Sequence, residues 1–208
     1  LLAKIAAEQG VLHWVQLSAL GADPKHRVAF VGSKGRGDEA VCQIGTAHRM
    51  RVLLARPSLV YGHGGASCEL FIRLARLPLL VLPEGGRQML QPVHVYDVAD
   101  GVAALLAASS RNATLNMSGG RALSLAAYLN TLRATLHGKT AARVLPLPSP
   151  LLAPFLPLTN YLSDGMVSAA TLRLLADGSC ADNRDFTALL GRAPLAPEQF
   201  AAADVAGF

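Results

Sequence analysis

Polar side chains that could carry chemistry follow the predicted strands of this chain. Ser18 ends the β-rich run VLHWVQLS, and Lys34 lies at the start of the helix that comes next. The segment RPSLVYGHG, residues 56–64, leaves an apolar run, and Asp97 lies near the positive end of a further helix. An open α/β sheet binds its ligands outside the carboxyl ends of its strands. These residues are therefore the candidates for a binding or catalytic site.

The elements that must position these side chains are apolar runs alternating with amphipathic segments. The apolar run MRVLLA, residues 50–55, is typical of a strand buried on both faces of a parallel sheet. The predicted strands are residues 11–18, 50–55, 79–83, 91–96 and 113–119. The predicted helices are residues 1–9, about 33–46, 68–77, 96–109 and 125–136, the last with Ser124 as its N-cap. Gly35 and Gly37 weaken the second helix by about 1 kcal/mol each relative to alanine.

Strands alternating with helices of this length predict an α/β fold whose parallel sheet is built from right-handed crossovers. We assign residues 1–140 to this α/β body and residues 141–208 to a connection and a helical tail. The connection is Pro-rich and is expected to be irregular over residues 146–157. The tail helices are expected at residues 166–177, 184–190 and 197–204.

Composition excludes several classes of function. With 51% hydrophobic and 16% charged residues, the chain is not intrinsically disordered. The net charge of +5 comes from scattered Lys and Arg side chains, which do not form the basic surface that binds nucleic acid. The 3 cysteines form no CxxC pair, which predicts reduced thiols, a cytoplasmic location and no metal site. Five prolines interrupt the longest apolar run, residues 144–158, so we expect no transmembrane segment.

Four consecutive blocks resemble the short-chain dehydrogenase/reductases: VQLSALGA, AFVGSKGRGDEAV, LLARPSLVYGHGG and GRQMLQPVHVYDVADGVAALL. They are most similar to the atypical or extended members of the NAD-dependent epimerase/dehydratase type. The run from ARPSLVYG to QPVHVYDVA resembles the branch that contains the 39-kDa accessory subunit of respiratory complex I. Together the blocks span roughly residues 1–140 in the family's order.

The resemblance implies the C-terminal portion of a Rossmann-like parallel sheet with helices on both faces and a small helical C-terminal tail. It implies NAD or NADP as the cofactor. The sequence opens within a helix and lacks the family's GxxGxxG phosphate turn, so we expect the first half of the Rossmann domain to be missing. The expected partners are a dinucleotide and either that half or a second copy of the chain. Either would cover the strand edge at residues 12–18.

The family's catalytic set is a serine and a Tyr-x-x-x-Lys pair, whose spacing puts both side chains on one helical face. The resemblance carries the serine onto Ser18 and the lysine onto Lys34, but Phe30 stands at the tyrosine position. A phenyl ring has no proton to exchange, so general acid–base catalysis is missing from its usual source.

Other roles follow from the same resemblance. The cofactor contacts that it implies are Leu17, Ser18, Lys34, Pro57, Ser58, Leu59 and Val60, the last four through backbone groups. Arg87, after a Gly-Gly turn, is where extended members place a basic residue toward a substrate phosphate. Roles unrelated to ligand binding remain open for three of these residues. Ser18 can be a strand-end hydroxyl, Lys34 an exposed helix lysine and Arg87 a surface charge.

Three other side chains are alternatives for the missing acid or base. Tyr61, His63 and His94 follow or end predicted strands, although packing or solvent-facing roles are more usual for such positions. The sequence thus predicts an NAD(P)-binding protein that is weak or inactive as an oxidoreductase. One alternative is an active nucleotide-sugar epimerase, dehydratase or reductase using another acid or base. A second is a non-catalytic scaffold or accessory subunit.

Overall fold

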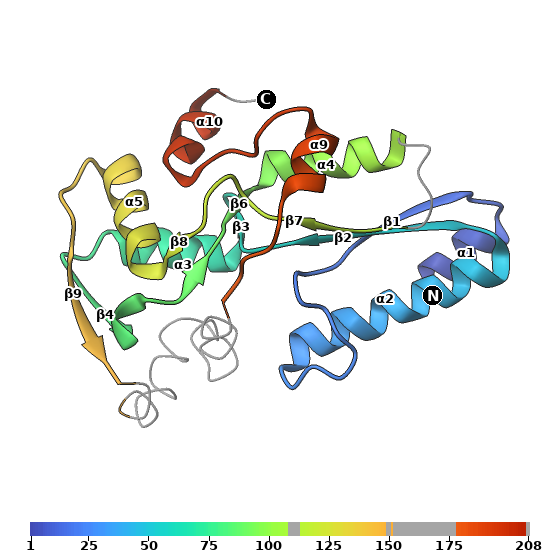
Figure 1. Ribbon diagram of the computed structural model, residues 1–208, viewed down its shortest axis with the longest axis horizontal. Helices are drawn as coiled ribbons and strands as arrows, with labels where there is room; N and C mark the ends of the chain where they lie inside the picture. The colour runs from blue at the N-terminus through green and yellow to red at the C-terminus, as the bar shows by residue number, and fades with distance from the viewer. Residues whose placement is uncertain (108–112, 149–150, 152–177, 207–208) are drawn as a thin grey trace. The chain divides into compact units, whose positions relative to one another are not determined.

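The structure is a computed structural model that describes residues 1–107, 113–148, 151 and 178–206 (Figure 1). Its residues group into two compact units, each assembled from three stretches of the chain. Unit 1 contains residues Leu1–Ser58, Val95–Ser118 and Ala181–Pro194. Unit 2 contains residues Leu59–His94, Gly119–Cys180 and Leu195–Phe208.

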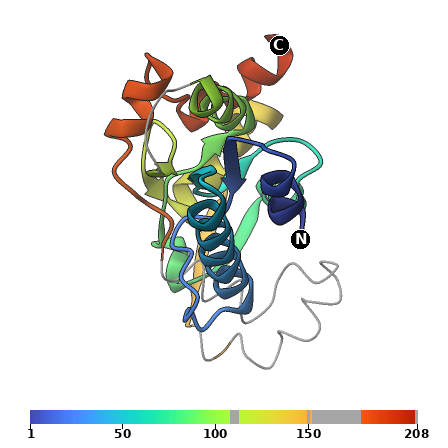
Figure 2. The same cartoon turned by 90° about the vertical axis from the view of Figure 1, so that its right-hand side faces the viewer.

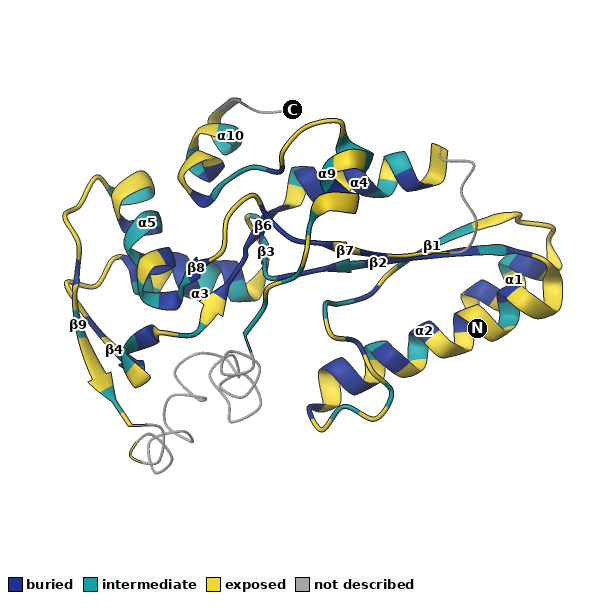
Figure 3. Ribbon diagram, viewed as in Figure 1, coloured by how far each residue is buried: buried dark blue, intermediate teal, exposed yellow. Residues whose placement is uncertain are grey.

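Unit 1 is built on a parallel sheet of three strands. They are β1 (His13–Leu17), β2 (Arg51–Pro57) and β7 (Ala113–Met117), in the order β1-β2-β7. Val15 lies opposite Leu53, and Leu53 lies opposite Ala113. The central strand β2 is buried along most of its length (Figure 3). The buried parallel strand that MRVLLA predicts is therefore confirmed.

Helices cover both faces of this sheet (Figure 2). Helices α1 (Leu2–Glu8) and α2 (Ala29–His48) pack together on one face, where Ala3, Ala7 and Val41 bury Val52 and Leu54. Helices α4 (Val95–Ala107) and α9 (Arg184–Leu190) pack against each other on the opposite face. The α/β class with helices on both faces is confirmed, as is the predicted helix at residues 184–190.

The described part of unit 2 contains three small sheets. Strands β3 (Val60–Tyr61) and β6 (Val93–His94) are parallel, as are β4 (Leu79–Pro83) and β9 (Arg143–Leu147). Strands β5 (Met89–Leu90) and β8 (Leu123–Ser124) are antiparallel. The helices among the described residues of unit 2 are α3 (Ala66–Ala75), α5 (Leu125–His137) and the C-terminal α10 (Phe200–Ala206), with the short 3-10 helices η1 (Glu84–Gly86) and η3 (Pro197–Gln199). The core contains Phe71, Tyr128, Leu129, Leu132 and Phe200.

Several predictions about unit 2 need correction. The strand expected over residues 91–96 is only Val93–His94, because α4 already begins at Val95. The connection expected to be irregular from residue 146 contains the end of β9, where Pro146 lies opposite Leu82. Proline is tolerated there because β9 pairs with β4 alone in a two-stranded sheet and is an edge strand. The helix expected at residues 166–177 lies outside the described residues.

The ends of α5 match their predicted signals. The Ser124 hydroxyl accepts a hydrogen bond from the Ala127 N–H at 3.2 Å, which confirms the N-cap. Arg133 of the same helix is buried, and one of its guanidinium nitrogens donates to the carbonyls of Ala75, Arg76 and Leu77. A cation thus binds the otherwise unpaired carbonyls at the C-terminal end of α3, joining the two helices.

Helix α2 begins four residues earlier than its sequence predicts, so Phe30 lies in its first turn. The reason is a close approach between α2 and the loop before it. A Cβ atom added to Gly35 would lie 2.2 Å from the Asp23 carbonyl carbon, whereas one added to Gly37 would meet nothing within 4 Å. Because Gly35 has no side chain, the loop can pack on the helix. Of the two glycines, only Gly37 weakens the helix without allowing such a contact.

We predict opposite effects for two substitutions in α2. Gly35→Ala forces the helix and the loop at Asp23 apart and lowers the free energy of unfolding by about 1–3 kcal/mol. Gly37→Ala, the matched control one half-turn away, raises it by about 0.5–1 kcal/mol because alanine is the better helix former. Urea denaturation followed by circular dichroism measures both, and equal effects of the two variants would show that the loop does not need Gly35.

Candidate functional site

Ser18 lies directly after β1 and is buried. Its backbone N–H donates to the Ala55 carbonyl of β2 at 2.8 Å, which continues the parallel ladder by one residue. Its hydroxyl donates to Oδ2 of Asp38 in α2, also at 2.8 Å. The Ser18 hydroxyl, which the resemblance assigns to a substrate oxygen, thus donates its hydrogen bond to a carboxylate of the protein itself.

Asp38 is buried and binds a second side chain through the same oxygen. Arg56 of β2 donates to Asp38 Oδ2 from Nε at 3.1 Å and from Nη2 at 2.9 Å. The other oxygen, Oδ1, has no hydrogen-bond partner among the residues that the structure describes. With its proton engaged by Asp38, Ser18 can still accept a hydrogen bond through the lone pairs of its hydroxyl oxygen.

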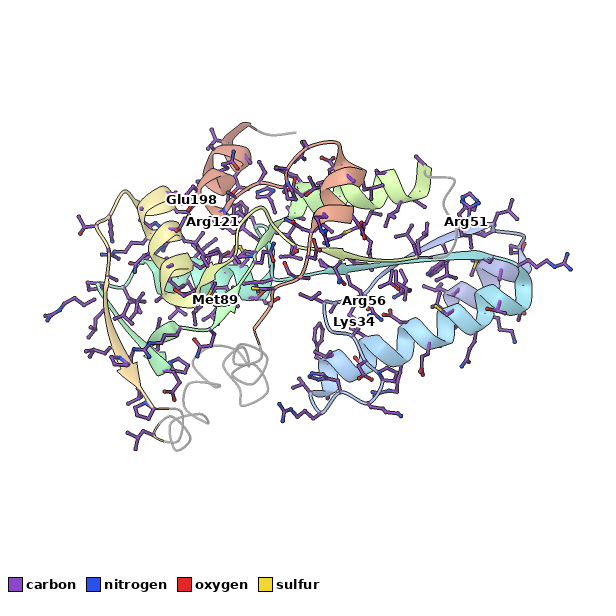
Figure 4. All side chains as sticks on the ribbon, in the orientation of Figure 1. Lys34, Arg51, Arg56, Met89, Arg121 and Glu198 are labelled. Atoms are coloured by element: carbon purple, nitrogen blue, oxygen red, sulfur yellow. The ribbon has the colours of Figure 1, made fainter. Side chains whose placement is uncertain are left out.

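Lys34 and Phe30 lie one helical turn apart, beside the end of β1. The ammonium of Lys34 donates to the Leu17 carbonyl at 3.4 Å and lies 5.9 Å from the centroid of the Phe30 ring. The Phe30 side chain is 57% exposed. Lys34 and Arg56 both appear between α2 and the sheet in Figure 4. Unit 1 therefore places Lys34 and Phe30 of α2 beside Leu17, the residue before Ser18, and the roles of these residues toward a cofactor or substrate stay predictions.

The four expected backbone contacts fall at the point where the chain passes from unit 1 to unit 2. In unit 1, the Pro57 carbonyl accepts from the Leu20 N–H at 2.8 Å, and the Ser58 N–H donates to the Met117 carbonyl at 3.0 Å. In unit 2, the Leu59 carbonyl accepts from the Val93 N–H at 2.9 Å, and Val60 belongs to β3. Those three groups already bind the protein's own backbone, and the role of these residues toward a cofactor stays a prediction.

Arg87 belongs to unit 2 and is exposed. It follows Gly85 and Gly86, whose φ angles of 69° and 67° are left-handed, a conformation that favours glycine. The turn therefore presents the guanidinium to solvent, and its role toward a substrate phosphate stays a prediction.

The three alternative acid or base residues converge on one carboxylate that the sequence analysis missed. The Tyr61 hydroxyl donates to Asp204 Oδ2 at 2.7 Å, and Nε2 of His94 lies 3.3 Å from Oδ1. Nε2 of the exposed His63 lies 3.2 Å from Oδ2. Burial, followed by the hydrogen bond to Asp204, raises the pKa of Tyr61 far above its usual value. Tyr61 is therefore a poor general acid near neutral pH, although its hydroxyl donates a hydrogen bond.

Asp38 was also missed, and so was its contact with Arg56 of the candidate segment, but a signal for Asp38 exists. It follows Lys34 by four residues, so Phe30, Lys34 and Asp38 recur at the spacing of one helical face. No local pattern connects Asp204 with His94, which lies 110 residues away.

Two further searches concern the described residues alone. Within residues 1–107, 113–148 and 178–206, no group of three or more His, Cys, Asp and Glu side chains has the geometry to hold a metal ion. In that part of the chain, every helix is also too short or too polar to cross a lipid bilayer.

Comparison with known proteins identifies the fold of the chain but not its family. No family model and no curated protein matches the chain. Solved structures do match. A nucleoside-diphosphate-sugar epimerase from Staphylococcus aureus is 19% identical with a TM-score of 0.67, covering 97% of this chain and 68% of its own. The NADPH-dependent quinone oxidoreductase from Escherichia coli, complexed with NADPH, is 16% identical with a TM-score of 0.69, covering 96% and 68%.

A third structure is a mutant of the UDP-glucuronic acid 4-epimerase from Bacillus cereus, in which phenylalanine replaces a tyrosine. It was solved with UDP-4-deoxy-4-fluoro-glucuronic acid and NAD. It is 16% identical with a TM-score of 0.65, covering 97% of this chain and 63% of that one. The chain therefore has the Rossmann-like fold of these proteins and spans about two thirds of their length.

The buried carboxylate of Asp38 generates a prediction about stability. Asp38→Ala removes the acceptor of the Ser18 hydroxyl and the partner of Arg56, and we expect the free energy of unfolding to fall by about 2 kcal/mol. Glu39→Ala, at the exposed neighbouring position of the same helix, is the control and changes it by less than about 0.5 kcal/mol. Urea denaturation measures both, and a neutral Asp38→Ala would show that the Ser18–Asp38–Arg56 contacts do not stabilise unit 1.

Proposed function

We propose that this chain is an NAD(P)-binding protein of the short-chain dehydrogenase/reductase superfamily, of the NAD-dependent epimerase/dehydratase or reductase type. We further propose that it has weak or no turnover as an oxidoreductase. The observation that carries the proposal is the placement of Ser18 and Lys34 at the carboxyl end of β1, with Phe30 beside them. The Rossmann-like fold supports the dinucleotide, because such sheets bind dinucleotides at the carboxyl ends of their strands.

The residues at this edge fit the nicotinamide half of such a cofactor. Lys34 keeps N–H donors beyond the one that binds the Leu17 carbonyl, and these suit the hydroxyls of a ribose. Exposed Phe30 and Leu17 offer apolar surface for a flat ring. When bound, the cofactor would supply the hydride donor or acceptor. The NAD and NADPH in the solved complexes of like fold support this class of ligand.

This site lacks a side chain that can exchange a proton with a substrate. Phe30 has no hydroxyl, and the Ser18 proton is held by the Asp38 carboxylate at 2.8 Å. Ser18 therefore acts toward a ligand as an acceptor of hydrogen bonds, and Lys34 acts as a donor. Lys34 can bind a hydroxyl group of a ligand, but a positioned general acid, typically worth 10²–10⁴-fold in rate, is missing.

Two alternative functions are not equally well supported. An active enzyme that uses another acid or base would need Tyr61, His63 or His94, and all three contact Asp204 instead. A non-catalytic scaffold or accessory role, like that of the complex I subunit whose sequence this chain resembles, is favoured by Phe30. The crystallised epimerase mutant shows that phenylalanine in place of a tyrosine is compatible with bound NAD in that protein.

Cofactor binding is tested by titration with NADH and NADPH while following the fluorescence of Trp14. This is the chain's 1 tryptophan, and it lies in β1 four residues before Ser18. We expect saturable quenching, and Lys34→Ala should weaken it about 10-fold, the loss of one charge-assisted hydrogen bond. Lys25→Ala removes the same charge from an exposed position and should not change it. Equal affinities of the two variants would contradict the assignment of Lys34.

The missing proton donor is tested by Phe30→Tyr. Turnover of UDP-glucose with NAD⁺, or of 1,4-benzoquinone with NADPH, should rise by about 10²-fold or more, because the new phenol lies beside the Lys34 ammonium. Phe30→Leu is the control that removes the ring without adding a hydroxyl, and it should give no gain. If both variants remain inactive while NADPH still binds, loss of the tyrosine is not what limits turnover.

A further inference from the structure

Two neighbouring strands of unit 2 place hydrogen-bond donors side by side. In the parallel pair β3 and β6, Tyr61 lies opposite His94, and their ring centroids are 5.4 Å apart. Both side chains are fully buried, so strand pairing and core packing fix their positions. The Tyr61 hydroxyl and Nε2 of His94 bind the two different oxygens of Asp204.

A third donor reaches the same carboxylate from solvent. His63 is 64% exposed and brings Nε2 to 3.2 Å from Asp204 Oδ2. Its Nδ1 lies 3.8 Å from Oε1 of Glu69 in α3, so a second carboxylate is nearby. Asp204 keeps 16% of its side chain exposed, so the cluster lies at the surface of unit 2 on the side of His63 and Asp204.

The chemistry of the three donors selects their ligand. A phenol and two imidazole N–H groups can bind one acceptor group that has two oxygens, and a carboxylate has that shape. Cys68 and Glu69 lie close enough to raise the pKa of Tyr61 further, which keeps its hydroxyl protonated as a donor. An amide or an alcohol would supply fewer acceptor oxygens and no charge.

The carboxylate of Asp204 belongs to helix α10, which has few other buried side chains. Helix α10 has 7 residues, and its first, Phe200, is fully buried and stacks on Tyr61 with centroids 4.7 Å apart. Beyond Phe200 the described side chains are small or exposed, with Val205 at 88% exposure. Asp204 is therefore the main contact that holds the second half of α10 down.

We propose that Tyr61, His63 and His94 form a carboxylate-binding site, which Asp204 of α10 occupies as an internal ligand. A small carboxylate, free or carried on a larger molecule, takes the place of Asp204 when the second half of α10 withdraws. The residues of this site all belong to unit 2, and the binding of a carboxylate to them does not require a cofactor.

Chemical rescue of Asp204→Ala tests the site. The variant should unfold at a temperature about 3–6 °C lower, because the buried Tyr61 hydroxyl loses its acceptor. Sodium acetate at pH 7 should restore most of this loss saturably, whereas acetamide and sodium chloride should not. Glu198→Ala removes an exposed carboxylate that pairs with Arg121 and is the matched control, with no acetate-specific recovery expected.

Two more measurements make the test decisive. In Asp204→Ala/Tyr61→Phe, half-maximal rescue should need about 10-fold more acetate, and an unchanged requirement would place the acetate elsewhere. In the wild-type chain, acetate should speed amide hydrogen exchange of residues 201–206 and leave α5 unchanged. Unchanged exchange in α10 would overturn the displacement, and this measurement needs no variant that must fold. If Asp204→Ala folds and acetate gives only the recovery seen with sodium chloride, no carboxylate site exists.

Discussion

The carboxylate of Asp38 holds helix α2 against the ends of two strands. Through Oδ2 it binds Ser18 after β1 and Arg56 in β2, so the helix and both strand ends meet at one buried atom. A buried carboxylate is stable only when charge and hydrogen bonds compensate its lost hydration, and Arg56 and Ser18 supply both. Because Phe30 and Lys34 belong to α2, their positions beside the end of β1 depend on these contacts.

The same interaction sets the chemistry of the edge. Because the Ser18 hydroxyl donates its hydrogen bond to the Asp38 carboxylate, it acts toward a ligand as an acceptor, and Phe30 has no hydroxyl. Lys34 is held next to Leu17 by a backbone carbonyl, which supports the proposed binding of a dinucleotide without efficient proton transfer. The proposed carboxylate site around Asp204 in unit 2 would be a second type of recognition.

Sequence patterns locate the elements where local signals are strong. The apolar run at residues 50–55 and the Ser124 cap predicted β2 and the start of α5, because burial and capping leave local marks in the sequence. Helix α2 starts earlier than predicted because its packing on the Asp23 loop through Gly35 is a tertiary effect. Asp38 lies 20 residues from Ser18, and Asp204 lies 143 residues from Tyr61, so neither partner could be found from local spacing alone. Spacing on one helical face did bring Phe30 and Lys34 together.

Saturation-transfer NMR with NADPH tests the central claim most directly, because it reports which half of the cofactor touches the protein. Irradiation of the aromatic protons of the chain should transfer magnetisation first to the nicotinamide ring and its ribose, which the account places beside Phe30 and Lys34. The transfer should fall when Phe30 is replaced by leucine. Transfer that is strongest to the adenine, or no transfer at NADPH concentrations up to the millimolar range, would contradict the assignment of this edge to the nicotinamide half.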